Sequence, residues 1–233
     1  NAYRAEKIDR RDTTIRPLAA EVARWFGIGD VELYVTAAAP RVCVPVFSNP
    51  CTILLGAELL AITDEREKLF VLARALKIAK SQLSIAVRAQ PLEVVTLVGG
   101  LVHSFDQHHM PAGVDPAHVA EAARRVVRNL VRRGPDELGP LVFEMAGRPG
   151  YDPAQLAMAA SQWGNRVALL AVGSVPSAVS ALAKLSGERE LPADPTARIA
   201  MLQRFTEAAD LLRFAISDVY FDARQHVRGG AGG

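Results

Sequence analysis

The stretch from Pro50 to Lys80 constrains the fold more than any other part of the chain. It begins with a short apolar run, Ile53 to Leu55, that ends at Gly56, and it continues into a long segment with apolar residues at helical spacing. Asp64 suits the N-cap of this helix, and Glu67 three residues later completes the pattern of a capping box. A strand followed by an amphipathic helix predicts that the helix packs beside a sheet.

Other segments extend this pattern. Residues 31–36 and 42–48 are rich in Val, Tyr and Phe and predict strands, with Pro45 placing the second at a sheet edge. Gly99 and Gly100, inside an apolar run, predict close helix packing or a break. The predicted helices cover 15–26, 64–83, 91–106, 115–133, 135–146, 153–172, 175–186 and 195–221. The predicted fold class is α+β and predominantly helical, with a small N-terminal β-sheet beside a helical body.

The two ends of the chain differ in composition from the rest. Residues 1–14 are charged and predict a lead-in arm, whereas 229–233 are glycine-rich and predict a flexible tail. We expect 15–228 to form a single domain, because a chain of 233 residues that is 50% hydrophobic can bury a substantial core. Trp25 and Trp163 are expected to anchor that core. The chain does not begin with Met, so we expect it to be a segment of a longer polypeptide.

The composition argues against several function classes. The 27 Lys and Arg against 25 Asp and Glu leave a net charge of +2, which does not indicate a nucleic-acid partner. No apolar run reaches the roughly 18 residues needed to span a bilayer, and no signal peptide is expected. Cys43 and Cys51 lack the C-x-x-C spacing of metal and redox sites, so we expect two buried thiols and a cytoplasmic location. No cofactor and no small-molecule substrate are expected.

The order of elements around the long helix resembles the core of the HtpX-like and CAAX-prenyl-protease-like zinc peptidases, a gluzincin family. In that family a strand, a leucine-rich short helix and an acidic turn lead into the helix that carries the H-E-x-x-H zinc motif. The same succession appears here in Ile53–Gly56, Glu58–Leu60, Asp64–Glu67 and Phe70–Ile78. The positions of the two zinc-binding histidines and the glutamate base fall on Arg74, Ala75 and Ile78.

These replacements remove the chemistry of the family, because arginine, alanine and isoleucine neither hold zinc nor act as a base at neutral pH. The family's third ligand comes from a later helix with an E-x-x-A-D pattern, and Ser161 and Asn165 occupy its glutamate and aspartate positions. The resemblance covers residues 31–186. It implies a degenerate zincin core, a pseudoenzyme without its metal site, of the kind found inside long multi-domain bacterial proteins.

We therefore expect a non-catalytic protein-interaction or scaffolding domain, whose partner is another protein or another domain of the same chain. The residues expected to contact the partner across the former cleft are Arg74, Lys77, Ile78, Ser161, Asn165 and Arg166. Arg74 would bring a permanent charge to the place that zinc holds in the family. An internal ion pair and a partner contact are both compatible with that charge.

A second basic surface is expected on the helix predicted over 115–133, where Arg125, Arg128 and Arg132 share a face. Such a face is either simply solvated or suited to an acidic protein surface. Nucleic acid is not favoured as the partner, because no aromatic side chains alternate with the arginines.

Two other functions remain as alternatives. His103, Asp106, His108 and His109, together with His118, are residue types that form metal or acid–base sites, so an enzyme is one alternative. A helix would, however, point His108 and His109 in different directions. The other alternative is a helical solenoid-like adaptor without peptidase ancestry, which would have no sheet beside the helix predicted over 64–83.

Overall fold

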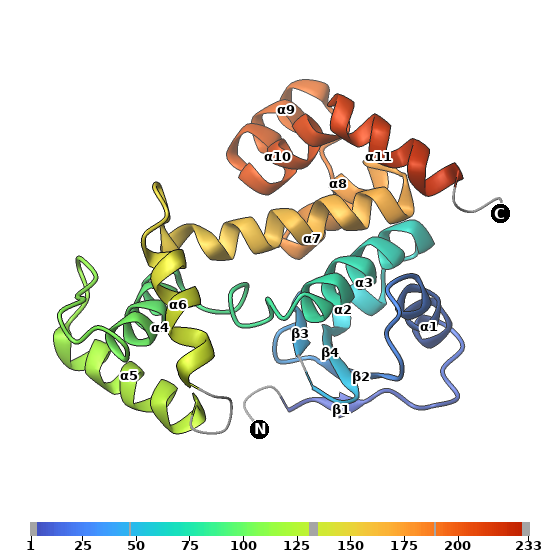
Figure 1. Ribbon diagram of the computed structural model, residues 1–233. Helices are drawn as coiled ribbons and strands as arrows, with labels where there is room; N and C mark the ends of the chain where they lie inside the picture. Colours follow the sequence, from blue (N-terminus) through green and yellow to red (C-terminus); the bar gives the residue numbers. More distant parts are fainter. Residues whose placement is uncertain (1–3, 47, 131–134, 189, 230–233) are drawn as a thin grey trace. The chain divides into compact units, whose positions relative to one another are not determined.

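The computed structural model describes residues 4–46, 48–130, 135–188 and 190–229. The chain forms two compact units: unit 1 comprises residues 1–84 and 160–233, and unit 2 comprises residues 85–159 (Figure 1). The single domain predicted over 15–228 stays a prediction, because this division does not say whether either unit folds alone. The glycine-rich tail lies outside the described residues, except for its first residue.

Unit 1 contains a four-stranded mixed sheet in the order β1–β2–β4–β3. The strands β2 (Val31–Thr36) and β4 (Cys51–Gly56) are parallel, whereas β1 (Glu6–Lys7) and β3 (Cys43–Val46) pair antiparallel with them at the two edges. Pro45 therefore lies in an edge strand, as predicted. The β1 strand falls inside the predicted lead-in arm, where two charged residues give no strand signal.

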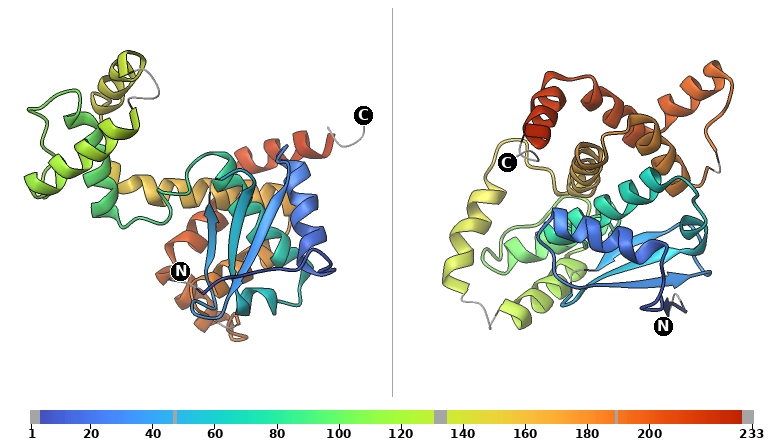
Figure 2. Two further views of the ribbon diagram at one scale, coloured as in Figure 1. Left: turned by 90° about the horizontal axis from the view of Figure 1, so that it is seen from below. Right: turned by 90° about the vertical axis from the view of Figure 1, so that its right-hand side faces the viewer.

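Helices α1 (Ile15–Trp25) and α3 (Glu65–Lys80) cover one face of this sheet (Figure 2). Leu33, Ile53 and Leu55 point to that face and are at most 1% exposed, and they pack with Phe70 of α3 in one hydrophobic core. Burial of each such side chain stabilises the fold by roughly 2 kcal/mol. The fold is α+β, as predicted, and a sheet beside α3 is not the architecture that the solenoid alternative requires.

The start of α3 confirms one half of the predicted capping box. The carboxylate of Asp64 accepts a hydrogen bond from the backbone N–H of Arg66 at 2.8 Å and another from the hydroxyl of Ser177 at 3.2 Å. Glu67 does not complete the box, because its carboxylate is 7% exposed and forms an ion pair with Lys184 of α8 (Val175–Leu185). A long-range charge partner has replaced the local contact that the sequence pattern predicts.

The remaining helices of unit 1 are α2 (Ala57–Leu60), α7 (Leu156–Val172) from Ala160 onward, α9 (Pro195–Arg204), α10 (Thr206–Ala215) and α11 (Asp218–Gly229). The single helix predicted over 195–221 is therefore wrong, since three helices occupy this region. The first break is at Phe205, whose ψ of 89° is not helical. The second is at Ser217, whose hydroxyl accepts a hydrogen bond from the backbone N–H of Tyr220 at 3.3 Å.

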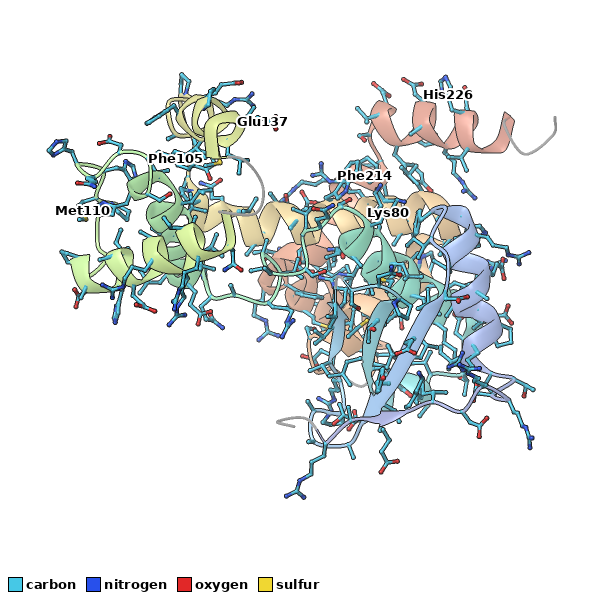
Figure 3. The ribbon with its side chains drawn as sticks, turned by 60° about the horizontal axis from the view of Figure 1, so that its bottom comes forward. Lys80, Phe105, Met110, Glu137, Phe214 and His226 are labelled. Atoms are coloured by element: carbon cyan, nitrogen blue, oxygen red, sulfur yellow. The ribbon has the colours of Figure 1, made fainter. Side chains whose placement is uncertain are left out.

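Unit 2 is built from α4 (Pro91–His103), α5 (Pro116–Leu130), α6 (Pro135–Ala146) and the short 3₁₀ helix η1 (Pro153–Gln155). A Cβ atom on Gly100 of α4 would lie 2.5 Å from the Cβ of Ala122 of α5, so the predicted close helix packing is confirmed. Phe105, just after α4, lies against α6 at Gly139 (Figure 3). None of the helices in the described ranges combines the length and the apolar character needed to cross a bilayer.

Candidate functional site

Side chains of α3 and α7 meet inside unit 1. Arg74 donates a hydrogen bond from Nε to Oδ1 of Asn165 at 2.7 Å and another from Nη2 to Oγ of Ser161 at 2.8 Å. One turn beyond Arg74 on α3, the side chain of Ile78 packs against Gly164 of α7, where a Cβ atom would lie only 2.8 Å from it. The structure thus brings together four of the six residues that the sequence places at the cleft.

A carboxylate from α10 completes this arrangement. Glu207 Oε2 accepts a hydrogen bond from Nδ2 of Asn165 at 3.1 Å and lies 3.9 Å from Nη2 of Arg74. The side chain of Arg74 is 12% exposed and that of Glu207 is 30% exposed, while Asn165 is fully buried. We call Arg74, Ser161, Asn165 and Glu207 the Arg74 cluster. Its buried polar atoms satisfy one another, as buried polar groups must.

The Arg74 cluster borders a groove of about 270 Å³, which we call the Arg74 groove. The groove is lined by β3 and the residues before it, by α8 and by the start of α10. The lining residues are Arg41, Val42, Cys43, Val44, Arg74, Leu182, Leu185, Ser186, Phe205 and Glu207. The second terminal nitrogen of Arg74, Nη1, hydrogen-bonds to none of the described residues and is not enclosed. Two N–H donors of this groove-lining residue are therefore without a partner among the described residues.

Arg41 is held at the edge of the same groove. Its Nε pairs with the Glu58 carboxylate at 2.6 Å, and its Nη1 donates a hydrogen bond to the backbone carbonyl of Gly187. The charge of Arg41 is thus balanced by Glu58. Arg74 supplies the more available cation, because its carboxylate partner is 3.9 Å away.

The basic residues that follow Arg74 along α3 do not share its surroundings. The Nζ atom of Lys77 lies 5.3 Å from the ring centre of Trp163 and 5.9 Å from that of Phe26, in a cation–π arrangement. Lys80 is exposed at the end of α3 (Figure 3). Trp163 is 47% exposed and Trp25 is 41% exposed, so the expectation that they anchor the core is wrong.

Arg166 is not among the residues that line the groove. Its guanidinium pairs with both carboxylate oxygens of Asp210, the shorter contact being 2.8 Å, and its Cζ atom lies 5.3 Å from the ring centre of Phe214. Ile78 is fully buried, so it has no surface for a partner. Among the six residues expected to contact a partner at the cleft, Arg74 alone lines the groove.

The histidine-rich segment of unit 2 makes mainly local contacts. His103 Nδ1 lies 3.1 Å from the backbone carbonyl of His109, and Asp106 accepts a hydrogen bond from the backbone N–H of His108 at 3.0 Å. His118 lies apart from these residues, on α5. Within the described ranges, no set of three or more His, Cys, Asp or Glu side chains is placed to hold a metal ion.

The predicted basic surface on α5 is only partly described. Arg125 and Arg128 are exposed and contact the same carboxylate, that of Glu121. Arg124, which the sequence did not place on this face, pairs with it too. Arg132 lies outside the described residues.

Cys43 and Cys51 are both free and both partly exposed, although the sequence predicts buried thiols. The sulfur of Cys43 is nevertheless enclosed, and this burial raises the pKa of the Cys43 thiol to about 12, while the nearby charge of Arg74 acts in the opposite direction. Burial also raises the pKa of Cys51. Both groups keep their protons near neutral pH and are poor nucleophiles there.

Cys43 gives a prediction about alkaline stability. The unfolded thiol loses its proton near pH 9.0 and the folded thiol near pH 12, so the folded state binds more protons between these values. The free energy of unfolding should therefore fall as the pH rises above about 9. We expect the urea midpoint of the wild type to decline more between pH 8 and pH 10.5 than that of Cys43→Ala. Equal declines would contradict the prediction.

Two residues that line the Arg74 groove, Glu207 and Arg41, could hardly be predicted from the sequence. Glu207 falls in the interior of the helix predicted over 195–221, where an acidic residue looks like part of a solvated face. Glu207 is an acidic residue in the first turn of α10, and such residues are a sequence sign that a new helix begins. Arg41 lies in the loop between two predicted strands, and its contact with Gly187 joins segments 146 residues apart.

Comparisons with protein-family models, curated proteins and solved structures found no match to this chain.

Proposed function

We propose that the chain is a non-catalytic interaction domain, in which the Arg74 groove binds a segment of a partner protein or of another part of the same polypeptide. One observation carries the proposal: the guanidinium of Arg74, a residue that lines the groove, is fixed by Ser161 and Asn165, while its Nη1 hydrogen-bonds to none of the described residues. A cation that is already held in place loses little conformational entropy on binding. Its two N–H groups suit a carbonyl or carboxylate oxygen.

The other polar groups of the groove also favour binding over catalysis. A guanidinium can donate hydrogen bonds but cannot accept a proton at neutral pH. The thiol of Cys43, with its pKa raised to about 12 by burial, is protonated under these conditions and is a poor nucleophile. The carboxylate of Glu207 is engaged by Asn165. These properties support a pseudoenzyme, the expectation that follows from the resemblance to zinc peptidases.

The proposal includes a cellular setting. Free thiols at Cys43 and Cys51 support a reducing compartment, and we propose the cytoplasm. The chain would act there as one part of a longer multi-domain protein.

Site-specific photocrosslinking tests the proposal. A benzophenone amino acid replaces Ser186, which lines the Arg74 groove, and a matched control places it at Ala20, which is exposed on α1. We expect a discrete adduct from position 186 and none of the same mass from position 20. Peptide mapping should join the partner segment to the groove. Arg74→Lys keeps the positive charge and lacks Nη1, so it should reduce the adduct by at least about tenfold.

Two outcomes would overturn the proposal. The first is an equal adduct from both probe positions. The second is an adduct from position 186 that is unchanged by Arg74→Lys in a variant whose circular dichroism spectrum and thermal unfolding match those of the wild type.

A further inference from the structure

Helix α5 carries an excess of positive charge on one exposed face of unit 2. Nη2 of Arg124, Nε of Arg125 and Nη2 of Arg128 lie 2.8, 2.9 and 3.7 Å from the carboxylate of Glu121. The arginine side chains are 68%, 66% and 71% exposed. Three cations around one anion leave two uncompensated positive charges.

An apolar groove runs beside these arginines. It has a volume of about 640 Å³ and lies between α5 and the C-terminal end of α4, and we call it the α5 groove. Ala120, Ala123 and Val127 line it from α5 at helical spacing, and Val127 is 47% exposed. Arg124 and Arg128 line it as well, together with Glu121, whose carboxylate both contact. The rest of the lining is polar and comes from the end of α4 and the residues after it: His103, Ser104 and Gln107. The groove thus combines an apolar strip with two exposed cations one helical turn apart.

We propose that the α5 groove binds an acidic amphipathic helix of a partner protein. The guanidinium groups of Arg124 and Arg128 are spaced to meet two carboxylates that are one turn apart on the partner. An apolar side chain between those carboxylates would lie against Val127 and Ala123, as in other complexes where a helix lies in a groove. This inference goes beyond the proposed role of the Arg74 groove, and it stands on residues of unit 2 alone.

The charge and the lining of the groove favour a protein helix over nucleic acid. An excess of two charges gives only a short run of phosphate contacts. None of the residues that line the groove is a Phe, Tyr or Trp on which bases stack. A helix with both carboxylates and apolar side chains uses the two arginines and the apolar strip, whereas a polyanion would use the arginines alone.

The test is a fluorescence-anisotropy titration of the full chain with two synthetic helical peptides. Both peptides carry leucines along one face, and these are flanked by glutamates four residues apart in one peptide and by lysines in the other. We expect saturable binding of the glutamate peptide, weakened by added NaCl, and no binding of the lysine peptide. Arg124→Glu with Arg128→Glu should raise the Kd of the glutamate peptide at least about tenfold. Val127→Asp should raise it as well.

The matched control is Arg148→Glu just after α6, because Arg148 is 69% exposed and is likewise paired with a glutamate, Glu144. It should leave the Kd unchanged. Equal binding of both peptides, or an unchanged Kd in the Arg124 and Arg128 double variant, would overturn the inference. Self-association of the chain that is lost in this double variant would assign the groove to a second copy. Tighter binding of single-stranded DNA than of the glutamate peptide would assign it to nucleic acid.

The two proposals fail separately. An adduct at position 186 that Arg74→Lys leaves unchanged would overturn the proposal for the Arg74 groove without altering the peptide titration. An absence of peptide binding would leave the crosslinking result unaffected.

Discussion

Arg74→Met is expected to lower the free energy of unfolding by about 3 kcal/mol. Methionine fills a similar volume but donates no hydrogen bond. Oδ1 of Asn165 and Oγ of Ser161 would then both lose the N–H group that donates to them. Asn165 is fully buried and Ser161 is 7% exposed, so water does not readily replace that donor. Leaving such groups unsatisfied costs about 1–3 kcal/mol each.

The expected size of the stability loss in Arg74→Met depends on how exposed the carboxylate of Glu207 is. Breaking a fully buried ion pair costs about 3–5 kcal/mol because an isolated charge remains. Glu207 is 30% exposed and lies 3.9 Å from Arg74, so water can solvate it after the substitution. The loss should therefore come mainly from the two hydrogen bonds, which places the expected value at the lower end of that range.

Urea denaturation followed by circular dichroism measures this effect. Arg66→Met is the matched control, because Arg66 is an exposed arginine on the same helix, and its substitution should change stability by less than about 0.5 kcal/mol. Combining Arg74→Met with Asn165→Leu should recover part of this loss in stability, since the donor and the acceptor of the Arg74–Asn165 hydrogen bond are then both removed. Equal urea midpoints for Arg74→Met and Arg66→Met would show that the Arg74 cluster does not stabilise the fold.

Local sequence patterns predicted the frame of unit 1 because each depends on near neighbours. The alternation of Val31, Leu33 and Val35 with other residues in β2, and the apolar spacing of α3, specify which side chains face a core, whatever lies opposite. Asp64 caps α3 through a backbone N–H two residues away. These predictions did not require knowing which strand or helix of the fold packs against each of these elements.

A long-range contact was predictable only where the resemblance to a known family assigned two distant sequence motifs to the same site. Arg74 and Asn165 are 91 residues apart, yet the resemblance to a peptidase placed both at one cleft, and they are hydrogen-bonded. Glu67 shows the opposite case, since its local pattern indicated a cap and its carboxylate pairs with Lys184, 117 residues away. A charged side chain takes whichever partner the fold brings near, and the sequence around it does not encode that choice.

The break between helices α9 and α10, just before Glu207, shows a second limit of prediction from local sequence. Neither Gly nor Pro occurs at 204–206, and the helix ends at Phe205 through a non-helical ψ of 89°. Local propensity favours continuation there, whereas Phe205 is packed against the core of unit 1. Tertiary packing therefore decides the break. That break puts Glu207 in the first turn of α10 beside Asn165.

Gly56→Ala is expected to lower the free energy of unfolding by at least about 3 kcal/mol. The backbone of Gly56 has φ −72° and ψ 147°, which alanine adopts without strain, so the cost is steric. A Cβ atom at this position would lie 2.2 Å from both the carbonyl carbon and the oxygen of Pro40, and 2.6 Å from the oxygen of Ala39. These are backbone atoms, so no rotamer change relieves the clash.

The loop that would have to move is held by two hydrogen bonds. The backbone N–H of Gly56 donates to the carbonyl of Val42 at 2.7 Å, and that of Glu58 donates to the carbonyl of Pro40 at 2.8 Å. Moving the loop away from an added methyl group breaks both bonds and shifts the residues that lead into β3. Because Arg41 and Cys43 line the Arg74 groove, this change should also weaken the crosslink at Ser186.

Gly29→Ala is the matched control, because a Cβ atom at Gly29 meets no atom within 4 Å and its φ lies outside the left-handed region. It should leave stability unchanged or raise it by up to about 1 kcal/mol. Thermal unfolding of the two variants separates the effects of the clash from those of losing a glycine. A Gly56→Ala protein that unfolds at the temperature of Gly29→Ala would show that the loop yields at little cost. The position of β3, and with it the shape of the Arg74 groove, would then not depend on the close approach of Pro40 to Gly56.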